Sequence, residues 1–379
     1  NTSLGYNSLS ANTTGLDNTA VGAHALDDNT TAERNVGVGC SALANNTTGE
    51  QNVAVGWHAM FTNTTAIQSC AFGSQSLKLS NGSYNNGFGH QTLEANTTGT
   101  QNQAFGLNAL TANTTGSNNV AMGHAALTAN TTGDGNTAVG SQALDSNTTA
   151  DYNTAIGINA LQATTTGTNN VAVGNNALYA HTTGYENTAI GARAGDSVTD
   201  GFRNCFMGED AGDDVTTGDN NVIIGRQTKA GASGSSSVVV IGAALTGKGD
   251  ATGFFGGSSG VYNSDNTSAW QTTSDRRIKK NIVDNNIGLD KINQIRVRNF
   301  EYRTPEEVDP ALPSHSAIDK QGTQVGVIAQ EIQEVLPDVV RVTSYGCYSV
   351  NPDNLTWYLV NAVKELSAKN DELAAEIAS

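Results

Sequence analysis

The feature that most constrains the fold of this chain is a short repeat that runs through its first two thirds. A glycine recurs every 17 residues from Gly5 to Gly242, with one step of 16, and fifteen copies align. A strict short period is typical of a solenoid, in which each coil buries one surface on the next. At the usual inter-strand spacing of about 4.8 Å, fifteen coils would form a rod of roughly 70 Å.

Two apolar columns accompany the repeat glycine. The residue before it is apolar in all fifteen copies, from Leu4 to Ile241, so we expect this column to point inward. Four residues after the glycine stands Leu in ten of the first eleven copies and Met60 in the other, with small residues between the columns. Each coil is predicted to contain a strand, a tight bend, a short strand and a turn, around a thin interior.

Asparagine forms a further column four residues before the glycine, broken by Ser69 and Val238. Stacked asparagines can hydrogen-bond along a column and satisfy amides that would be costly to bury alone. The Asn-Thr-Thr-Gly segments, such as residues 12–15, supply turn chemistry. They also match an N-glycosylation acceptor and a threonine array for binding ice. Nothing argues for a eukaryotic secretory route, however, and adjacent threonines in a turn point apart.

The pattern decays from Ala194 onward. Gly195 and Gly212 replace the Leu column, and acidic residues cluster within 209–214, which we interpret as solvated turns in preference to a calcium site. A Gly/Ser-rich stretch follows at 231–237, and large aromatic residues return within 254–270. We predict a shaft over 1–230, a transition and neck over 231–273, and a separate domain over 274–379.

Bulk properties exclude several classes of function. The net charge of −16 argues against a nucleic-acid partner, because such binding depends on cations that neutralise phosphates. The sequence contains no run of eighteen apolar residues, so it does not predict a membrane-spanning helix. The four cysteines lie far apart, so we expect neither a disulfide nor a metal site, and no cofactor. The chain begins inside a repeat without an initiating Met, so we expect it to be part of something longer.

The repeat Asn-Thr-Ala-Val-Gly-x-x-Ala-Leu resembles the head repeat of trimeric bacterial adhesins, although the repeat here is a few residues longer. The resemblance implies left-handed parallel β-rolls that associate in threes.

A second resemblance begins at Ser274-Asp275-Arg276-Arg277-Ile278-Lys279-Lys280-Asn281-Ile282 and continues through the block 324–337. The sequence resembles the self-cleaving intramolecular chaperone domains, of the endosialidase type, that end many phage tailspikes and tail fibres. The resemblance implies a catalytic dyad of Ser274 and Lys279 and a scissile bond next to Ser274, most simply Ser274–Asp275.

This chemistry is also plausible from the residue types. A serine hydroxyl is a weak nucleophile and needs a base, and a lysine serves as one only if desolvation or neighbouring cations lower its pKa. Arg276, Arg277 and Lys280 are such neighbours. The alternative is that this segment is a basic strand with a purely structural role.

The rest of the last domain reads as α+β. We predict a short helix over 287–295, a strand over 297–302, a loop over 304–321, a strand running into a helix that Pro337 stops, and paired strands over 339–350. His315 is interpreted as a solvated loop residue. Over 355–379 the apolar positions alternate in steps of four and three with Asn370 in the series, which predicts a coiled-coil helix.

The expected fold class is therefore mainly β: a trimeric β-roll or β-solenoid shaft, then a small α+β domain ending in a three-stranded coiled coil. The leading hypothesis is a tail fibre or spike of a virion, assembled in the host cytoplasm, whose last domain drives trimerisation and then cleaves itself. Expected partners are two further copies, upstream tail or baseplate proteins, and a host receptor of glycan or protein. The alternative is an adhesin that permanently retains an uncleaved trimerisation cap. A bacterial surface adhesin and a glycan-degrading tailspike have less support.

Overall fold

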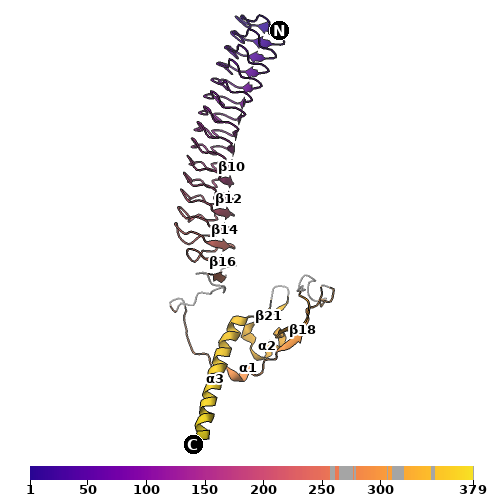
Figure 1. Cartoon of the computed structure of the whole chain (residues 1–379), viewed down its shortest axis with the longest axis vertical. Coiled ribbons are helices and arrows are strands. Elements are labelled where there is room, and N and C mark those ends of the chain that lie inside the picture. The colour runs from indigo at the N-terminus through magenta and orange to yellow at the C-terminus, as the bar shows by residue number, and fades with distance from the viewer. Residues whose placement is uncertain are drawn as a thin grey trace. The chain divides into compact units, whose positions relative to one another are not determined.

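The computed structural model describes residues 1–256, 261–263, 276, 279–304, 306–309, 320–342 and 346–378. The chain divides into two compact units, Asn1–Thr273 and Ser274–Ser379. The first is a parallel β-solenoid and the second a small α+β region with a terminal helix (Figure 1). This confirms the predicted order of the two folds.

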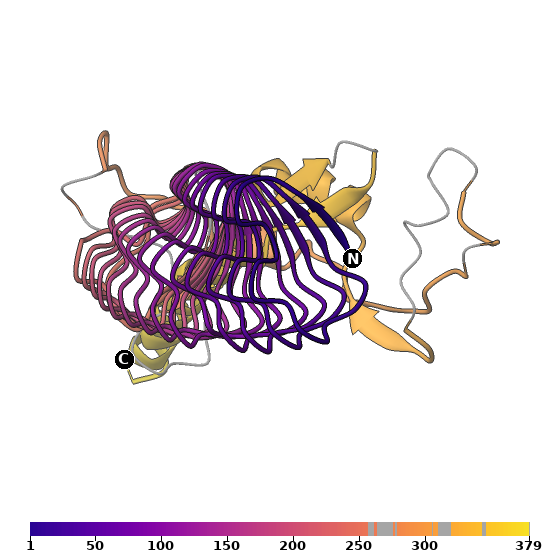
Figure 2. The ribbon, with the colours of Figure 1, turned by 90° about the horizontal axis from the view of Figure 1, so that it is seen from above.

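Each coil of the solenoid contributes one strand of three residues, and successive strands pair in parallel one repeat apart, as in Thr19 with Val36. The coils stack along one gently curved axis (Figures 1 and 2). The strands are β1 (Thr2–Leu4), β2 (Thr19–Val21), β3 (Val36–Val38), β4 (Val53–Val55), β5 (Cys70–Phe72), β6 (Asn86–Phe88), β7 (Gln103–Phe105), β8 (Val120–Met122), β9 (Thr137–Val139), β10 (Thr154–Ile156), β11 (Val171–Val173), β12 (Thr188–Ile190), β13 (Cys205–Met207), β14 (Val222–Ile224) and β15 (Val239–Ile241).

The strand column continues into the segment that follows Gly231. β16 (Gly253–Phe255) pairs in parallel with β15, and β17 (Val261–Asn263) pairs antiparallel with β16. Most of the remaining aromatic segment expected as a neck, 257–260 and 264–273, lies outside the described residues.

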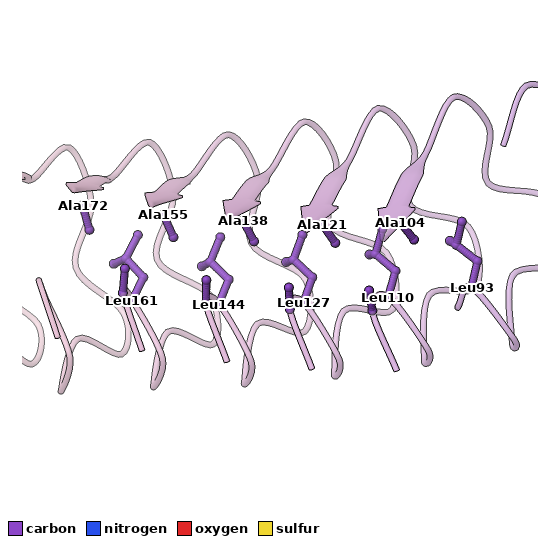
Figure 3. Close-up of a cluster of buried hydrophobic side chains, with 14 of the residues drawn as sticks. Leu93, Ala104, Leu110, Ala121, Leu127, Ala138, Leu144, Ala155, Leu161 and Ala172 are labelled. Carbon is purple, nitrogen blue, oxygen red and sulfur yellow. The ribbon is translucent and has the colours of Figure 1, made fainter. Parts of the chain in front are cut away.

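Alanine and leucine fill the interior of the coils. The middle residue of most strands is a fully buried Ala, and it points toward the Leu column, as Ala138 and Leu144 illustrate in Figure 3. The Leu column is fully buried from Leu26 to Leu178. The predicted thin interior is thus confirmed.

The apolar column before the glycine does not point inward, so that prediction was wrong. Side chains alternate across a strand, and a three-residue strand with its middle residue inside must turn the other two outward. Phe72 remains 40% exposed and Met122 43%, although each is flanked by the side chains of neighbouring coils. No member of this column is buried.

The predicted second strand of each coil is a turn instead. His24 and Leu26 both have positive φ (56° and 51°), which bends the chain at alternate residues. Hydrogen bonds still join the coils there, because the N–H of Leu26 donates to the carbonyl of Ala42 (3.0 Å). The repeat glycine has its own requirement: Gly22 has φ 133°, and a Cβ would lie 2.5 Å from the carbonyl oxygen of Gly39.

Buried asparagines link the coils, as predicted. Asn18 Oδ1 accepts from the backbone N–H of Asn35 (2.9 Å), and Asn18 Nδ2 donates to the carbonyl of Ala32 (2.8 Å). The asparagines of the Asn-Thr-Thr-Gly turns form a second buried column, in which Asn46 donates to Asn29 (3.0 Å). This second column was interpreted from sequence as turn chemistry alone.

The second asparagine column ends with a change of chemistry. Thr164 and His181 replace asparagine after Asn147, and Asn147 Oδ1 is buried without a hydrogen-bond partner. Thr164 Oγ1 lies 3.1 Å from His181 Nδ1, which gives the buried imidazole a partner.

One coil is a residue short. β5 pairs with β6 sixteen residues on, Cys70 with Asn86. In the turn of this coil Asn81 Oδ1 accepts from both the N–H (2.7 Å) and the hydroxyl (3.0 Å) of Thr64. In other coils a backbone carbonyl accepts the corresponding N–H, so an asparagine side chain replaces that carbonyl here.

The apparent decay of the pattern near Ala194 is a compensating change of side-chain size: the residue in the middle of one strand becomes larger, and two residues of the Leu column become smaller. Phe206 takes the middle position of β13 and is fully buried. A Cβ on Gly195 or Gly212 would lie 2.6 or 2.3 Å from its ring. The ring therefore occupies room that leucines fill elsewhere.

The acidic residues of this region form ion pairs between neighbouring coils, on surfaces that remain partly exposed. The pairs are Arg193 Nε with Asp210 (2.6 Å), Arg226 Nε with Glu209 (3.0 Å) and Lys229 Nζ with Asp213 (3.2 Å). None of the four cysteines, all described, forms a disulfide. Among the described residues, no helix has the length and apolar character needed to cross a bilayer.

The described residues of the second unit form two small antiparallel sheets and three α-helices. Its elements are α1 (Leu289–Ile292), β18 (Arg298–Phe300), β19 (Gln324–Gly326), α2 (Ala329–Val335), the 3₁₀ turn η3 (Pro337–Val339), β20 (Val340–Val342), β21 (Tyr348–Val350) and α3 (Pro352–Ala378). β18 pairs with β19, and β20 with β21. The strand that runs into a helix before Pro337 is confirmed.

Candidate functional site

Of the residues predicted to carry self-cleavage, Lys279 is the one that the structure describes. Its side chain is exposed, and its backbone N–H donates to the carbonyl of Arg276 (3.3 Å). Ser274 and Asp275 lie outside the described residues, as does His315. The Ser274–Lys279 dyad and the Ser274–Asp275 bond therefore stay predictions.

The segment after Lys279 is held on α3. Asn361 Nδ2 donates to the carbonyls of Asn285 (2.8 Å) and Ile287 (3.1 Å). Glu365 Oε2 accepts from the N–H of Leu289 (3.0 Å) at the start of α1. Gly288 between them is buried, and a Cβ there would lie 2.2 Å from Glu365 Oε1. The chain that leads away from the predicted dyad is thus fixed to α3.

A small apolar core supports this arrangement. Ile332, Leu336 and Val339 pack against Tyr358 of α3. The Tyr358 hydroxyl donates to the Asp338 carboxylate, and this hydrogen bond, together with burial, raises the pKa of Tyr358. α3 is therefore attached to the body of the unit both by apolar packing and by a polar contact.

A bidentate ion pair joins the first sheet to α2. Arg298 Nη2 and Nε donate to Glu331 Oε1 (2.7 Å) and Oε2 (3.1 Å). The hydrogen bonds raise the pKa of Arg298 and lower that of Glu331, so both groups stay charged over the ordinary pH range. Because the pair remains partly exposed to solvent, we assign it an orienting role and no large contribution to stability.

α3 presents a second, unpartnered apolar face. The buried side of the helix carries Tyr358 and Ala362, whereas the heptad positions on the other side are exposed. Every residue from 366 to 378 is exposed. The exposed heptad members are Leu359, Val363, Leu366, Leu373 and Ile377, with Asn370 in the same series.

Sequence reasoning missed the contacts of Asn361 and Glu365. Both are polar residues that share the inner side of α3 with Tyr358 and Ala362. Polar residues in an otherwise buried helical stripe are the signal that could have found them, since such groups need hydrogen-bond partners.

The structure defines a class of protein: a repetitive β-solenoid followed by a small α+β unit whose terminal helix has an exposed apolar stripe. A family model described as the chaperone of endosialidase, Peptidase_S74, matches residues 274–341. The match begins at Ser274, the first residue of the second unit. The match supports a C-terminal folding chaperone of the kind found in tail-fibre-like proteins, and the matched family implies self-cleaving peptidase activity in general.

Proposed function

We propose that this protein is a virion tail fibre or spike for host attachment, and that its second unit aligns three chains and then cuts itself off next to Ser274. The observation that carries the proposal is that the chaperone match starts at Ser274, where the repetitive unit ends. The proposed partners are two further copies, upstream tail or baseplate proteins, and a host receptor of glycan or protein. Assembly would take place in the host cytoplasm.

The solenoid gives a physical reason for a chaperone. Equivalent coils differ little, so chains displaced by one repeat would still pair much of their surface. Register is weakly specified in such repeats unless another element imposes it. Each chain carries one second unit. Association of three such units would align the three chains before the shaft forms.

The exposed stripe of α3 supports association of the second units. A helical segment of about a dozen residues is marginal in water unless its apolar face is buried. Leu366, Leu373 and Ile377 lie in the part of α3 where every residue from 366 to 378 is exposed in the single chain. A three-stranded coiled coil would bury them, and Asn370 in the seam would select register and strand number.

In the proposed cleavage, neutral Lys279 takes the proton of the Ser274 hydroxyl, whose oxygen attacks the carbonyl carbon on the N-terminal side of Ser274 through a five-membered ring. The C–N bond breaks as the lysine returns the proton to the Ser274 nitrogen, and water then hydrolyses the ester, which leaves a new carboxylate, a new amine and the Ser274 hydroxyl. An attack on the carbonyl of Ser274 itself, which a cut at Ser274–Asp275 requires, would close a strained four-membered ring. The reaction is a single turnover within one chain, where proximity supplies much of the rate enhancement. Loss of the aligning unit would leave the shaft kinetically trapped, because an unfolded chain could no longer refold in register.

Denaturing gels and native mass measurement of the purified full chain test this proposal. Wild type should yield a shaft fragment that ends near residue 274, and Ser274→Ala and Lys279→Ala should remain full length. Lys320→Ala, at an exposed lysine outside the motif, is the matched control and should cleave. Full-length wild-type chains in a folded trimer would refute cleavage, and a monomeric wild type would refute the aligning role.

The exposure of Lys279 favours a second candidate, an adhesin with a permanently retained cap. Burial is one of the ways in which a lysine becomes a base, and it is missing at this residue in the single chain. Covalently joined shaft and second unit in mature particles would support this candidate.

A further inference from the structure

The outward side of the strands, which we call the strand face, is uncharged along its whole length. It consists of the first and third residues of β1 to β15. The third residue is always apolar, and the first is Thr, Val, Cys, Asn or Gln. In these fifteen strands, all of which the structure describes, no position holds Asp, Glu, Lys or Arg.

The other surfaces of the same coils carry the charge. Asp27, Glu50, Asp134 and Asp151 lie in turns, and the net charge of the chain is −16. Acidic rods repel one another unless they meet along a surface that is free of charge. The strand face is such a surface, and it follows the solenoid from its first coil to β15.

The exposed apolar area matches that of a protein interface. Eight of the fifteen side chains in the third column are at least 36% exposed, and the other seven are half-buried. A large side chain covers on the order of 150 Å² when fully buried, so the eight leave roughly 60 Å² each and the seven roughly half of that. The column therefore exposes on the order of 700 Å², close to what each partner contributes to a standard interface. Monomers rarely expose contiguous apolar patches of more than a few hundred Å².

The strand face is not the same in every coil, because three successive coils carry phenylalanine in the third column. Phe72, Phe88 and Phe105 stack across three successive coils, with ring centroids 5.1 and 4.8 Å apart and interplanar angles of 7° and 3°. In the same column, Val55 precedes the three phenylalanines and Met122 follows them. A second copy displaced by one coil would set a phenylalanine against a valine at one end of this stack.

We propose that the strand face is the surface along which copies of this chain pack in parallel, with Phe72, Phe88 and Phe105 at one level in every copy. The occupant is a second copy because the uncharged surface runs along all fifteen strands and its area matches one partner's share of an interface. Parallel, symmetric packing would then bring identical levels together. This inference rests on the self-association in the proposed function, and adds where the shafts touch and what fixes their level.

Site-specific cross-linking of the full chain tests the surface and the level. Met122→Cys, in a chain whose native cysteines are replaced by serine, should give covalent dimers with a short bismaleimide. The yield should exceed that of Thr132→Cys, an exposed turn position, by at least tenfold. When tagged Met122→Cys chains are co-expressed with Val173→Cys chains, three coils away, cross-links should join like positions and not unlike ones.

Charge insertion provides the second measurement. Ile156→Glu changes an exposed side chain and spares the interior of the coil, as does the control Thr132→Glu. Ile156→Glu should lower the thermal midpoint of the assembled shaft, and the control should not. If native mass shows association while Met122→Cys cross-links no better than Thr132→Cys, the strand face is not the interface, and the inference fails while the proposed function stands. Monomeric chains would overturn both.

Discussion

Phe206 offers the sharpest test of how the coils are packed. Its ring is fully buried at the middle of β13, where most coils have alanine, and it takes the space above Gly195 and Gly212. If the ring substitutes for leucines of the Leu column, the effects of mutating Phe206 and Gly212 must be strongly coupled. Phe206→Ala, Gly212→Leu and the double variant measure that coupling.

The expected magnitudes follow from the geometry. Phe206→Ala leaves a cavity and should cost about 3–5 kcal/mol of unfolding free energy. Gly212→Leu alone places its Cβ 2.3 Å from the ring and should cost about 3 kcal/mol of unfolding free energy through overpacking. In the double variant the new leucine fills the cavity and should restore roughly 2 kcal/mol. It adopts the positive φ that Leu178 already has, at a cost of about 1 kcal/mol.

Urea unfolding at equal chain concentration is the assay, because association makes apparent stability depend on concentration. Ala172→Phe is the matched control, since β11 retains the leucines Leu161 and Leu178 and has no room for a ring. A double variant whose loss equals the sum of the single losses within about 0.5 kcal/mol would refute the compensating change of side-chain size.

Three further predictions concern the polar contacts. Burial lowers the pKa of His181 to about 4. Between that value and the ordinary 6.5 the unfolded chain binds a proton that the folded chain does not, so stability is lost as the pH falls through this window. The loss should reach about 2–3 kcal/mol between pH 7 and 4.5, and urea midpoints should show that His181→Asn removes most of it. Asn119→Ala leaves the N–H of Asn136 unpaired and removes one of the two donors to the carbonyl of Gly133, which keeps its hydrogen bond from Asn130 Nδ2 (3.1 Å). It should cost about 1–3 kcal/mol of unfolding free energy in the same assay, against less than about 0.5 kcal/mol for the exposed Thr115→Ala. Asn361→Ala removes two hydrogen bonds that hold the segment after Lys279, so it should reduce the cleaved fraction on gels without changing shaft unfolding. Unchanged cleavage would show that this anchoring is dispensable.

The sequence predicted the solenoid well because its period is a direct record of coil length. It misled us about the column from Leu4 to Ile241, because apolarity alone does not distinguish a buried column from an exposed one. The better signal was the small residue in the middle of each strand, such as Ala138, since only a small side chain fits the thin interior. The positive φ of Leu26 could not be anticipated, as leucine rarely adopts it.

The candidate site was less accessible to sequence reasoning. The motif from Ser274 to Ile282 and the block at 324–337 indicated the domain, and the family match agrees with that assignment. The attachment of Asn285 to Asn361 joins residues 76 positions apart, and no local pattern encodes such a pair. Helix periodicity located the seam of α3 because that seam is local.

The coil that lacks one residue limits which coils of the shaft can be gained or lost in evolution. Seventeen-residue coils are nearly interchangeable, so duplication or loss of whole coils elsewhere would alter the reach of the shaft in steps of about 4.8 Å and leave its cross-section intact. The sixteen-residue coil, in which Asn81 completes the turn, has no equivalent among the other coils. If copies pack in parallel as proposed, this coil would have to stay at one level in every copy, and the shaft would lengthen or shorten on either side of it.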